Sequence, residues 1–150
     1  MARNRIGLQF TGWEEMIEKI DKVAGDAGIK RAVEDGLKAS KQHVNAKITP
    51  IMAKSILPAQ GHYSQGETLE SLDRNFSVDW NGPTAEIKIG FDFSKSGLKS
   101  IFLMHGTPRH KPPMAAVPGL HDAIYGKKTM SEIKRIQKEA ITKYIERGLK

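Results

Sequence analysis

The residues of this sequence that could bind a metal or transfer a proton are its five histidines, His43, His62, His105, His110 and His121. No two of them have the i, i+4 spacing of a helical zinc motif, and Pro108 separates His105 from His110. The sequence contains no cysteine, which excludes thiolate ligands, a cysteine nucleophile and disulfides. We therefore predict no metal site and no cofactor.

Other residues common in active sites lack their usual context. Neither a Gly-x-Gly-x-x-Gly loop nor a Walker loop is present, and Ser64, Ser71 and Ser96 have no Gly-x-Ser-x-Gly surroundings. The adjacent carboxylates at 14–15 and 34–35 fall on predicted helix surfaces, where such residues commonly solvate the helix. We therefore predict a protein that is not an enzyme.

Composition indicates one globular domain over residues 1–150, because 39% of the residues are hydrophobic and 27% are charged. No apolar run approaches the roughly 18 residues that span a bilayer, and the start MARNRIGLQF lacks the apolar core of a signal peptide. We expect synthesis in the cytoplasm and no membrane partner. The formal charge of +7 favours encounters with DNA or an acidic surface, and it equally fits an ordinary soluble protein.

Two helices and a strand are predicted before the middle of the chain. Alternating apolar residues predict a strand at 6–10, and a three- to four-residue period predicts a helix over 12–24. A longer helix begins at Asp26 or Gly28. Its apolar stripe comprises Val33, Leu37, Ser40, Val44, Ile48, Ile51 and Ser55. Pro50 lacks an N–H, so we expect a kink or a break there, followed by a polar loop beyond Pro58.

An antiparallel hairpin is predicted next. Phe76, Val78 and Trp80 alternate with polar residues, 81–83 is a turn signal, and alternation resumes from 85 to 91. We expect Trp80 and Ile87 on the buried face and Asp79 and Lys88 on the other. A polar turn at 92–97 and a third strand at 98–104 complete the predicted sheet.

The last predicted helix begins at Thr129, because Thr129-x-x-Glu132 has the spacing of a capping box. Lysines and arginines occupy much of the helix surface outside its apolar face, which makes it a basic amphipathic helix. The predicted fold class is α+β: an antiparallel sheet covered by amphipathic helices, with a long helix before the sheet and a helix after it.

The segment 101–124 joins an apolar run to a helix through a proline-rich loop. The run 101–104 ends at Gly106-Thr107-Pro108, and prolines at 108, 112, 113 and 118 fix φ in the residues that follow. A stiff surface loop loses little conformational entropy on binding, so this one is suited to docking.

The same segment resembles a family of small tailed-phage neck proteins that complete the tail or join it to the head. In that family a strand runs into a Gly-Thr pair, here Gly106-Thr107, and a basic proline-rich loop leads to a helix that opens with Pro-Phe-Leu-x-Pro-Ala-Leu. Pro118, Leu120 and Ala123 match that opening and Ile124 is conservative, whereas Gly119, Asp122 and His105 depart from the pattern. Upstream, 65–72 carries glycine, leucine, serine and an aliphatic residue in the family's order, after Pro58.

The resemblance implies a structural virion protein of the neck or tail, assembled as a homo-oligomeric ring, a hexamer, with neck, connector or tail-tube proteins as neighbours and DNA passing through the lumen. The loop would be the joint between subunits or layers. Its candidate interface residues are Thr107, Pro108, Arg109, His110, Lys111, Pro112, Pro113 and Met114. The alternative is a basic nucleic-acid-binding domain, a regulator or a nuclease, which would use the lysines and arginines of the final helix on phosphates.

Overall fold

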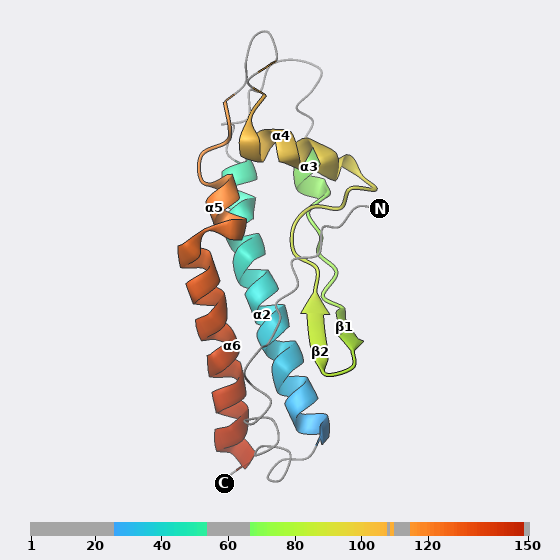
Figure 1. Ribbon diagram of the computed structural model, residues 1–150, viewed down its shortest axis with the longest axis vertical. Helices are drawn as coiled ribbons and strands as arrows, with labels where there is room; N and C mark the ends of the chain where they lie inside the picture. Colours follow the sequence, from blue (N-terminus) through green and yellow to red (C-terminus); the bar gives the residue numbers. More distant parts are fainter. Residues whose placement is uncertain (1–25, 54–66, 108, 110–114, 149–150) are drawn as a thin grey trace. The chain divides into compact units, whose positions relative to one another are not determined.

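The computed structural model describes residues 26–53, 67–107, 109 and 115–148 (Figure 1). The strand predicted at 6–10, the helix predicted at 12–24 and the loop predicted after Pro58 lie outside these residues, apart from Glu67. The predicted α+β class is confirmed: the chain has a two-stranded antiparallel sheet, a long helix before it and a helix after it.

The elements in chain order are α2 (Asp26–Ala53), α3 (Glu67–Glu70), β1 (Val78–Asn81), β2 (Thr84–Ile87), the 3-10 turn η1 (Ser96–Leu98), α4 (Lys99–His105), α5 (Leu120–Tyr125) and α6 (Lys127–Gly148). They form two compact units. Unit 1 includes the described parts of His43–Arg74 and Ile89–Met130. Unit 2 includes the described parts of Arg5–Gln42, Asn75–Lys88 and Ser131–Lys150.

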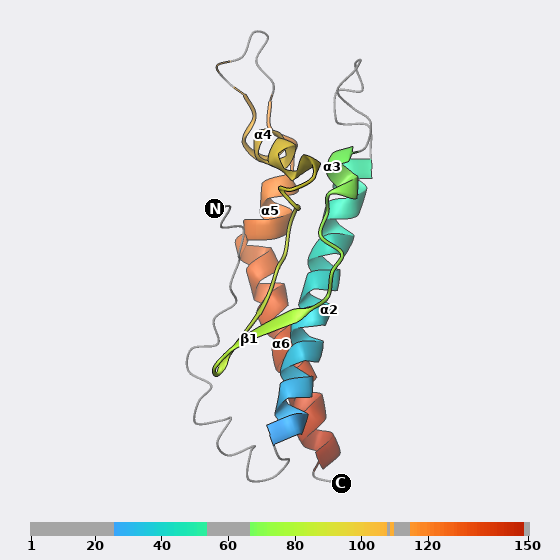
Figure 2. The ribbon, with the colours of Figure 1, turned by 90° about the vertical axis from the view of Figure 1, so that its right-hand side faces the viewer.

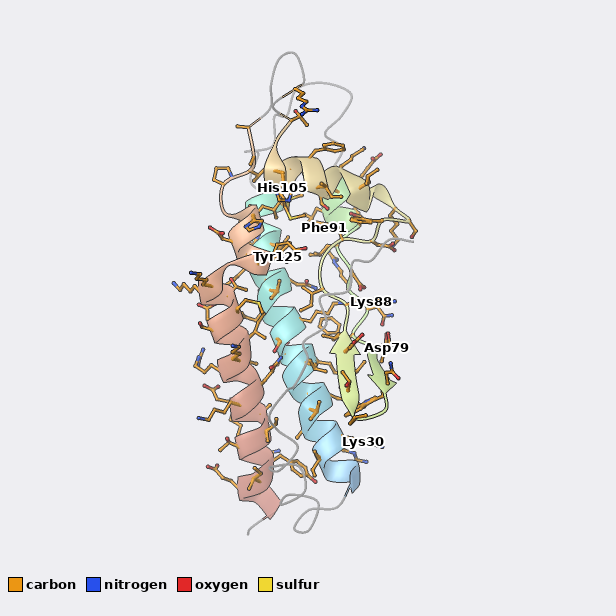
Figure 3. The ribbon with its side chains drawn as sticks, viewed as in Figure 1. Lys30, Asp79, Lys88, Phe91, His105 and Tyr125 are labelled. Carbon is orange, nitrogen blue, oxygen red and sulfur yellow. The ribbon has the colours of Figure 1, made fainter. Side chains whose placement is uncertain are left out.

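The hairpin of unit 2 has the predicted register. Val78 pairs with Ile87 and Trp80 with Ala85, and Gly82 makes the turn with a φ of 59°, a conformation that glycine adopts without strain. Ala85 and Ile87 are buried, Val78 and Trp80 are half-buried, and Asp79 is exposed. Figure 3 shows Asp79 and Lys88 on the side of the hairpin away from α2. The predicted faces are therefore correct, with Ile87 deeper than Trp80.

Two helices pack together in unit 2, where the N-terminal half of α2 lies beside the C-terminal part of α6 (Figures 1 and 2). Leu37 of α2 and Ile133 and Ile141 of α6 are buried. The helices are in contact there, because a Cβ added at Gly36 would lie 3.4 Å from the Cβ of Ala140, an ordinary van der Waals distance. The apolar stripes that the sequence predicts on both helices thus form the helical part of this core.

Helix α2 is not broken at Pro50, although the sequence predicts a kink or a break there. It continues to Ala53 with Pro50 inside it. The carbonyl of Ala46 loses its helical donor at Pro50, but both residues are exposed, so water can satisfy that carbonyl. Ile48 and Met52, which are buried in unit 1, favour continuation of the helix.

The predicted strand at 98–104 is wrong, because these residues form the end of η1 and most of α4. The preceding turn sets the helical path: the carbonyl of Asp92 accepts bonds from the N–H groups of Lys95 and Gly97, and the Ser100 hydroxyl bonds to the carbonyl of Gly97 at 2.5 Å. A Cβ at Gly97 would overlap the Asp92 carbonyl, so this turn requires glycine. A four-residue apolar run has no period that distinguishes a strand from a helix.

The helix that the sequence predicts near Pro118 is α5, and the predicted start of the last helix is two residues late. Gly119 precedes α5 with a φ of 80°, and α6 begins at Lys127. Thr129 is buried, and its hydroxyl donates to the carbonyl of Asp122 at 2.8 Å. That hydroxyl therefore joins α6 to α5 instead of capping a helix. In the described residues, no helix is long and apolar enough to cross a membrane.

Candidate docking surface

Helix α4 carries an exposed apolar stripe. Leu98, Ile101, Phe102 and His105 follow one another at intervals of three, one and three residues, which places them on one helix face. Leu98 is 57% exposed, Ile101 37% and Phe102 48%. Large apolar side chains gathered on one exposed face are typical of interaction sites. We call Leu98, Ile101 and Phe102 the α4 patch.

Polar contacts on the other faces of α4 hold the patch outward. Ser100 is buried, and Lys99 Nζ lies 2.9 Å from Glu67 Oε2 of α3. The N–H of Val117 donates to the carbonyl of Leu103 at 2.7 Å, which fixes the segment before α5 against the end of α4. The helix is thus anchored along its length, so the α4 patch is a preformed surface.

An aromatic edge continues from the α4 patch onto α5. The ring centroids of His105 and His121 are 5.7 Å apart in an edge-on arrangement, and those of His121 and Tyr125 are 5.2 Å apart. Tyr125 is 46% exposed. Figure 3 shows His105 on α4 and Tyr125 on α5 within this unit. Sequence reasoning did not pair His105 with His121.

Of the eight predicted interface residues, the structure describes Thr107, which is half-buried, and Arg109, which is exposed. Pro108, His110, Lys111, Pro112, Pro113 and Met114 lie outside the described residues. The loop starts directly from the end of α4. Gly106 has a φ of 73°, and its N–H donates to the carbonyl of Phe102 at 2.7 Å. Only Gly106 therefore separates His105, the end of the exposed stripe, from Thr107, the first predicted interface residue.

In the described part of the chain, no group of three or more histidine, aspartate and glutamate side chains is arranged to hold a metal ion. His105 and His121 lie together with Asp122, whose Oδ1 is 3.4 Å from His121 Nδ1, but all three are exposed. These three side chains are therefore accessible to a partner.

A second surface feature lies in unit 2. An open groove of about 420 Å³ is lined by Asp35, Lys38, Ala39 and Gln42 of α2 and by Phe76. Phe76 is 38% exposed and precedes β1. The sequence pattern predicted Phe76 on the buried face of the hairpin, and the structure instead leaves part of its ring at the surface. We call this feature the Phe76 groove.

Comparison of the chain with protein-family models, with curated proteins and with solved structures gives no match.

The α4 patch has a signal in the sequence that the strand interpretation hid. The spacing of residues 98, 101, 102 and 105 is that of a helix face, whereas a strand would place 101 and 103 on one side and 102 and 104 on the other. The Phe76 groove has no such signal, because it depends on how α2 and the hairpin pack.

Proposed function

We propose that this protein is a structural assembly protein of the tailed-phage neck or tail, and that it forms a homo-oligomeric ring, a hexamer, that completes the tail or joins it to the head. The observation that carries the proposal is the exposed α4 patch, which runs directly into the Gly106-Thr107 pair and the loop after it. In this proposal the mature protein resides in the virion.

The motif residues have structural roles that fit the proposal. The matches Leu120 and Ala123 and the conservative Ile124 are the buried residues of α5. They hold α5 in the core of unit 1, and α5 carries the aromatic edge beside the α4 patch. Upstream, Ser71 is buried and its carbonyl accepts from the N–H of Asp92 at 2.7 Å, at the start of the turn that leads to α4. Both motifs thus support the element that presents the patch.

Surface chemistry supports an assembly role over catalysis. Apolar and aromatic side chains such as those of Ile101, Phe102 and Tyr125 are typical of the centres of protein interfaces. A proline-rich loop beside them would lower the entropy cost of ordering on contact. A ring would cover these side chains in every subunit.

Mass photometry or native mass spectrometry of the purified protein tests the proposal. We expect a discrete oligomer with a mass about six times the 16.7 kDa of the chain, as for the homo-oligomers with closed symmetry that most soluble assemblies form. Ile101→Ser with Phe102→Ser should reduce the oligomer and the yield of joined particles while leaving circular dichroism unchanged. Glu70→Ser, an exposed polar change in the same unit, is the matched control. A wild-type protein that stays monomeric at all concentrations would contradict the proposal.

The charge of α6 favours a second candidate, a domain that binds nucleic acid. Its exposed cations in unit 2 are Lys134, Arg135, Lys138, Lys143 and Arg147. Arg135 pairs with Glu139 at 2.8 Å. A face of lysines with few apolar residues resembles a non-specific phosphate-binding surface.

Fluorescence anisotropy with a short DNA duplex at several salt concentrations tests this second candidate. Lys134→Glu with Lys138→Glu should abolish salt-dependent binding, whereas Lys88→Glu, an exposed change on the hairpin, should weaken it less. No binding by the wild-type protein at low salt would exclude this candidate.

A further inference from the structure

A closed ring of more than two copies requires two different surfaces on each subunit, because each copy meets one neighbour with one face and the next neighbour with another. The exposed large apolar side chains of the described residues lie in two places: Leu98, Ile101, Phe102 and Tyr125 in unit 1, and Phe76 in unit 2. One place is a projecting helix face and the other is a groove.

We propose that the α4 patch of one copy docks into the Phe76 groove of the next copy. This inference rests on the proposed ring and names its subunit contact. The occupant of the groove is therefore a second copy of this chain, and its chemistry is that of an amphipathic helix with apolar anchors.

The lining of the Phe76 groove lies along one helix face. Asp35, Lys38, Ala39 and Gln42 are spaced at i, i+3, i+4 and i+7, so they form a single face of α2, and Phe76 closes it from the hairpin side. The small side chain of Ala39 leaves room between the longer ones. Aliphatic parts of Lys38 and Gln42 can cover apolar atoms of a partner while their polar ends stay in water.

Lys41 holds Phe76, the aromatic residue of the groove, in place. Lys41 is completely buried, its Nζ lies 5.5 Å from the Phe76 ring centroid, and the same Nζ donates to the carbonyl of Asn75 at 2.5 Å. A cation over one face of the ring fixes its position and leaves other parts of the ring for contact. Phe76 is therefore an ordered anchor, which lowers the entropy cost of docking.

The two sites carry one pair of opposite charges, Asp35 and Lys95, while the other cation of the groove lining, Lys38, lies 3.5 Å from Glu34 Oε2. Asp35 is exposed at the groove, and Lys95 is exposed in the turn that leads to α4, three residues before Leu98. Docking that places Lys95 near Asp35 of the next copy would pair opposite charges.

Cysteine crosslinking tests this contact without background, because the chain has no cysteine of its own. In the double variant Asp35→Cys, Lys95→Cys, both sides of the proposed contact carry an exposed thiol and all apolar side chains remain. Native mass spectrometry of this variant before crosslinking checks that the ring still forms without the Asp35–Lys95 charge pair. A short bismaleimide should convert it to a ladder that ends at the ring mass. A mixture of the two single variants should give dimers, and each single variant alone should give none. Thr142→Cys with Lys95→Cys, which places a thiol on the exposed side of α6, is the matched control and should give no ladder.

The outcomes separate this inference from the proposed function. If native mass spectrometry shows a ring but the double variant gives no ladder, the contact is wrong and the ring proposal stands. Dimers of Lys95→Cys alone would show a two-fold contact at α4 and would also overturn the inference. If the wild-type protein forms no oligomer, the ring proposal fails and this contact fails with it. Labelling of each variant with a monofunctional maleimide confirms that its thiols react.

Discussion

The indole Nε1 of Trp80 donates a hydrogen bond of 3.1 Å to Oε1 of Glu34, which ties β1 to the N-terminal half of α2. The same carboxylate reaches Lys38 with its other oxygen at 3.5 Å, and Lys30 lies 5.9 Å from the centroid of the Trp80 ring. Lys30 and Lys38, one turn of α2 before and after Glu34, thus lie near the indole ring and near the carboxylate respectively. This contact orders the hairpin beside the Phe76 groove.

Trp80→Phe should therefore destabilise the protein by about 1 kcal/mol, the usual net value of one hydrogen bond. Trp80→Ala should cost about 2 kcal/mol, less than the roughly 3 to 5 kcal/mol of a fully buried aromatic, because the side chain is half-buried. Urea denaturation monitored by circular dichroism measures both. Asp79→Ala, on the exposed face, should change the free energy of unfolding by less than about 0.5 kcal/mol. If it is as damaging as Trp80→Ala, the assigned faces are wrong.

Gly28 of α2 lies against the side chain of Tyr144 of α6 in unit 2. A Cβ at Gly28 would overlap the Tyr144 ring, whereas a Cβ at Gly36 would meet Ala140 at an ordinary distance. Gly28→Ala should displace the ring and cost about 1 to 2 kcal/mol, the range of overpacking. Gly36→Ala should be neutral or stabilise by up to about 1 kcal/mol, because alanine favours helix. Thermal melting of the two variants tests the difference.

A double-mutant cycle identifies the cause of the Gly28 effect. When Tyr144→Ala is already present, Gly28→Ala should lose its penalty, because the overlapping ring has been removed. An unchanged penalty would show that the helix backbone, and not the tyrosine, resists the substitution.

Lys41 combines a buried hydrocarbon stem with a hydrogen-bonded ammonium group. Lys41→Ala should cost about 2 to 4 kcal/mol because it leaves a cavity beside Phe76. Lys41→Met keeps most of the volume and should cost about 1 kcal/mol for the lost bond to Asn75. Denaturant midpoints of the two variants give the order. Equal losses would mean that the ammonium contacts, and not the stem, determine the effect.

The hairpin and the long helices can be predicted from sequence because their signals extend over many residues. In the hairpin, alternation on both strands and the turn at Gly82 agree, so faces and register follow. The strand predicted at 98–104 fails because four apolar residues fit a helix equally well, and the decision is made by the turn between Asp92 and Gly97.

The candidate site was located only in part. The sequence pointed to the loop after Gly106, and the structure adds the α4 patch immediately before it. Stiffness of a proline-rich segment can be read from composition, but exposure of Ile101 and Phe102 depends on which side of α4 packs on the rest of unit 1. The Phe76 groove depends likewise on tertiary packing.

Thr129 has the sequence spacing of a capping box but a different role in the structure. Thr129 is 2% exposed, and its hydroxyl donates to the Asp122 carbonyl at 2.8 Å while accepting from Lys47 Nζ at 3.2 Å. It thus connects α6 with α5 and with α2 inside unit 1. The spacing from Thr129 to Glu132 is that of a capping box, but helix α6 already begins two residues earlier, at Lys127.

Thr129→Val tests this role, because valine keeps the shape of threonine and removes the hydroxyl. It should cost about 1 kcal/mol, since the carbonyl of Asp122 loses this donor and keeps only the N–H of Gly126. Thr129→Ser should retain both bonds and lose less. Lys128→Ala, an exposed change at the neighbouring position, should shift stability by less than about 0.5 kcal/mol. Urea denaturation of the three variants measures these differences. If Thr129→Val and Thr129→Ser lose equal stability, the methyl packing of Thr129, and not its hydroxyl, joins α6 to α5.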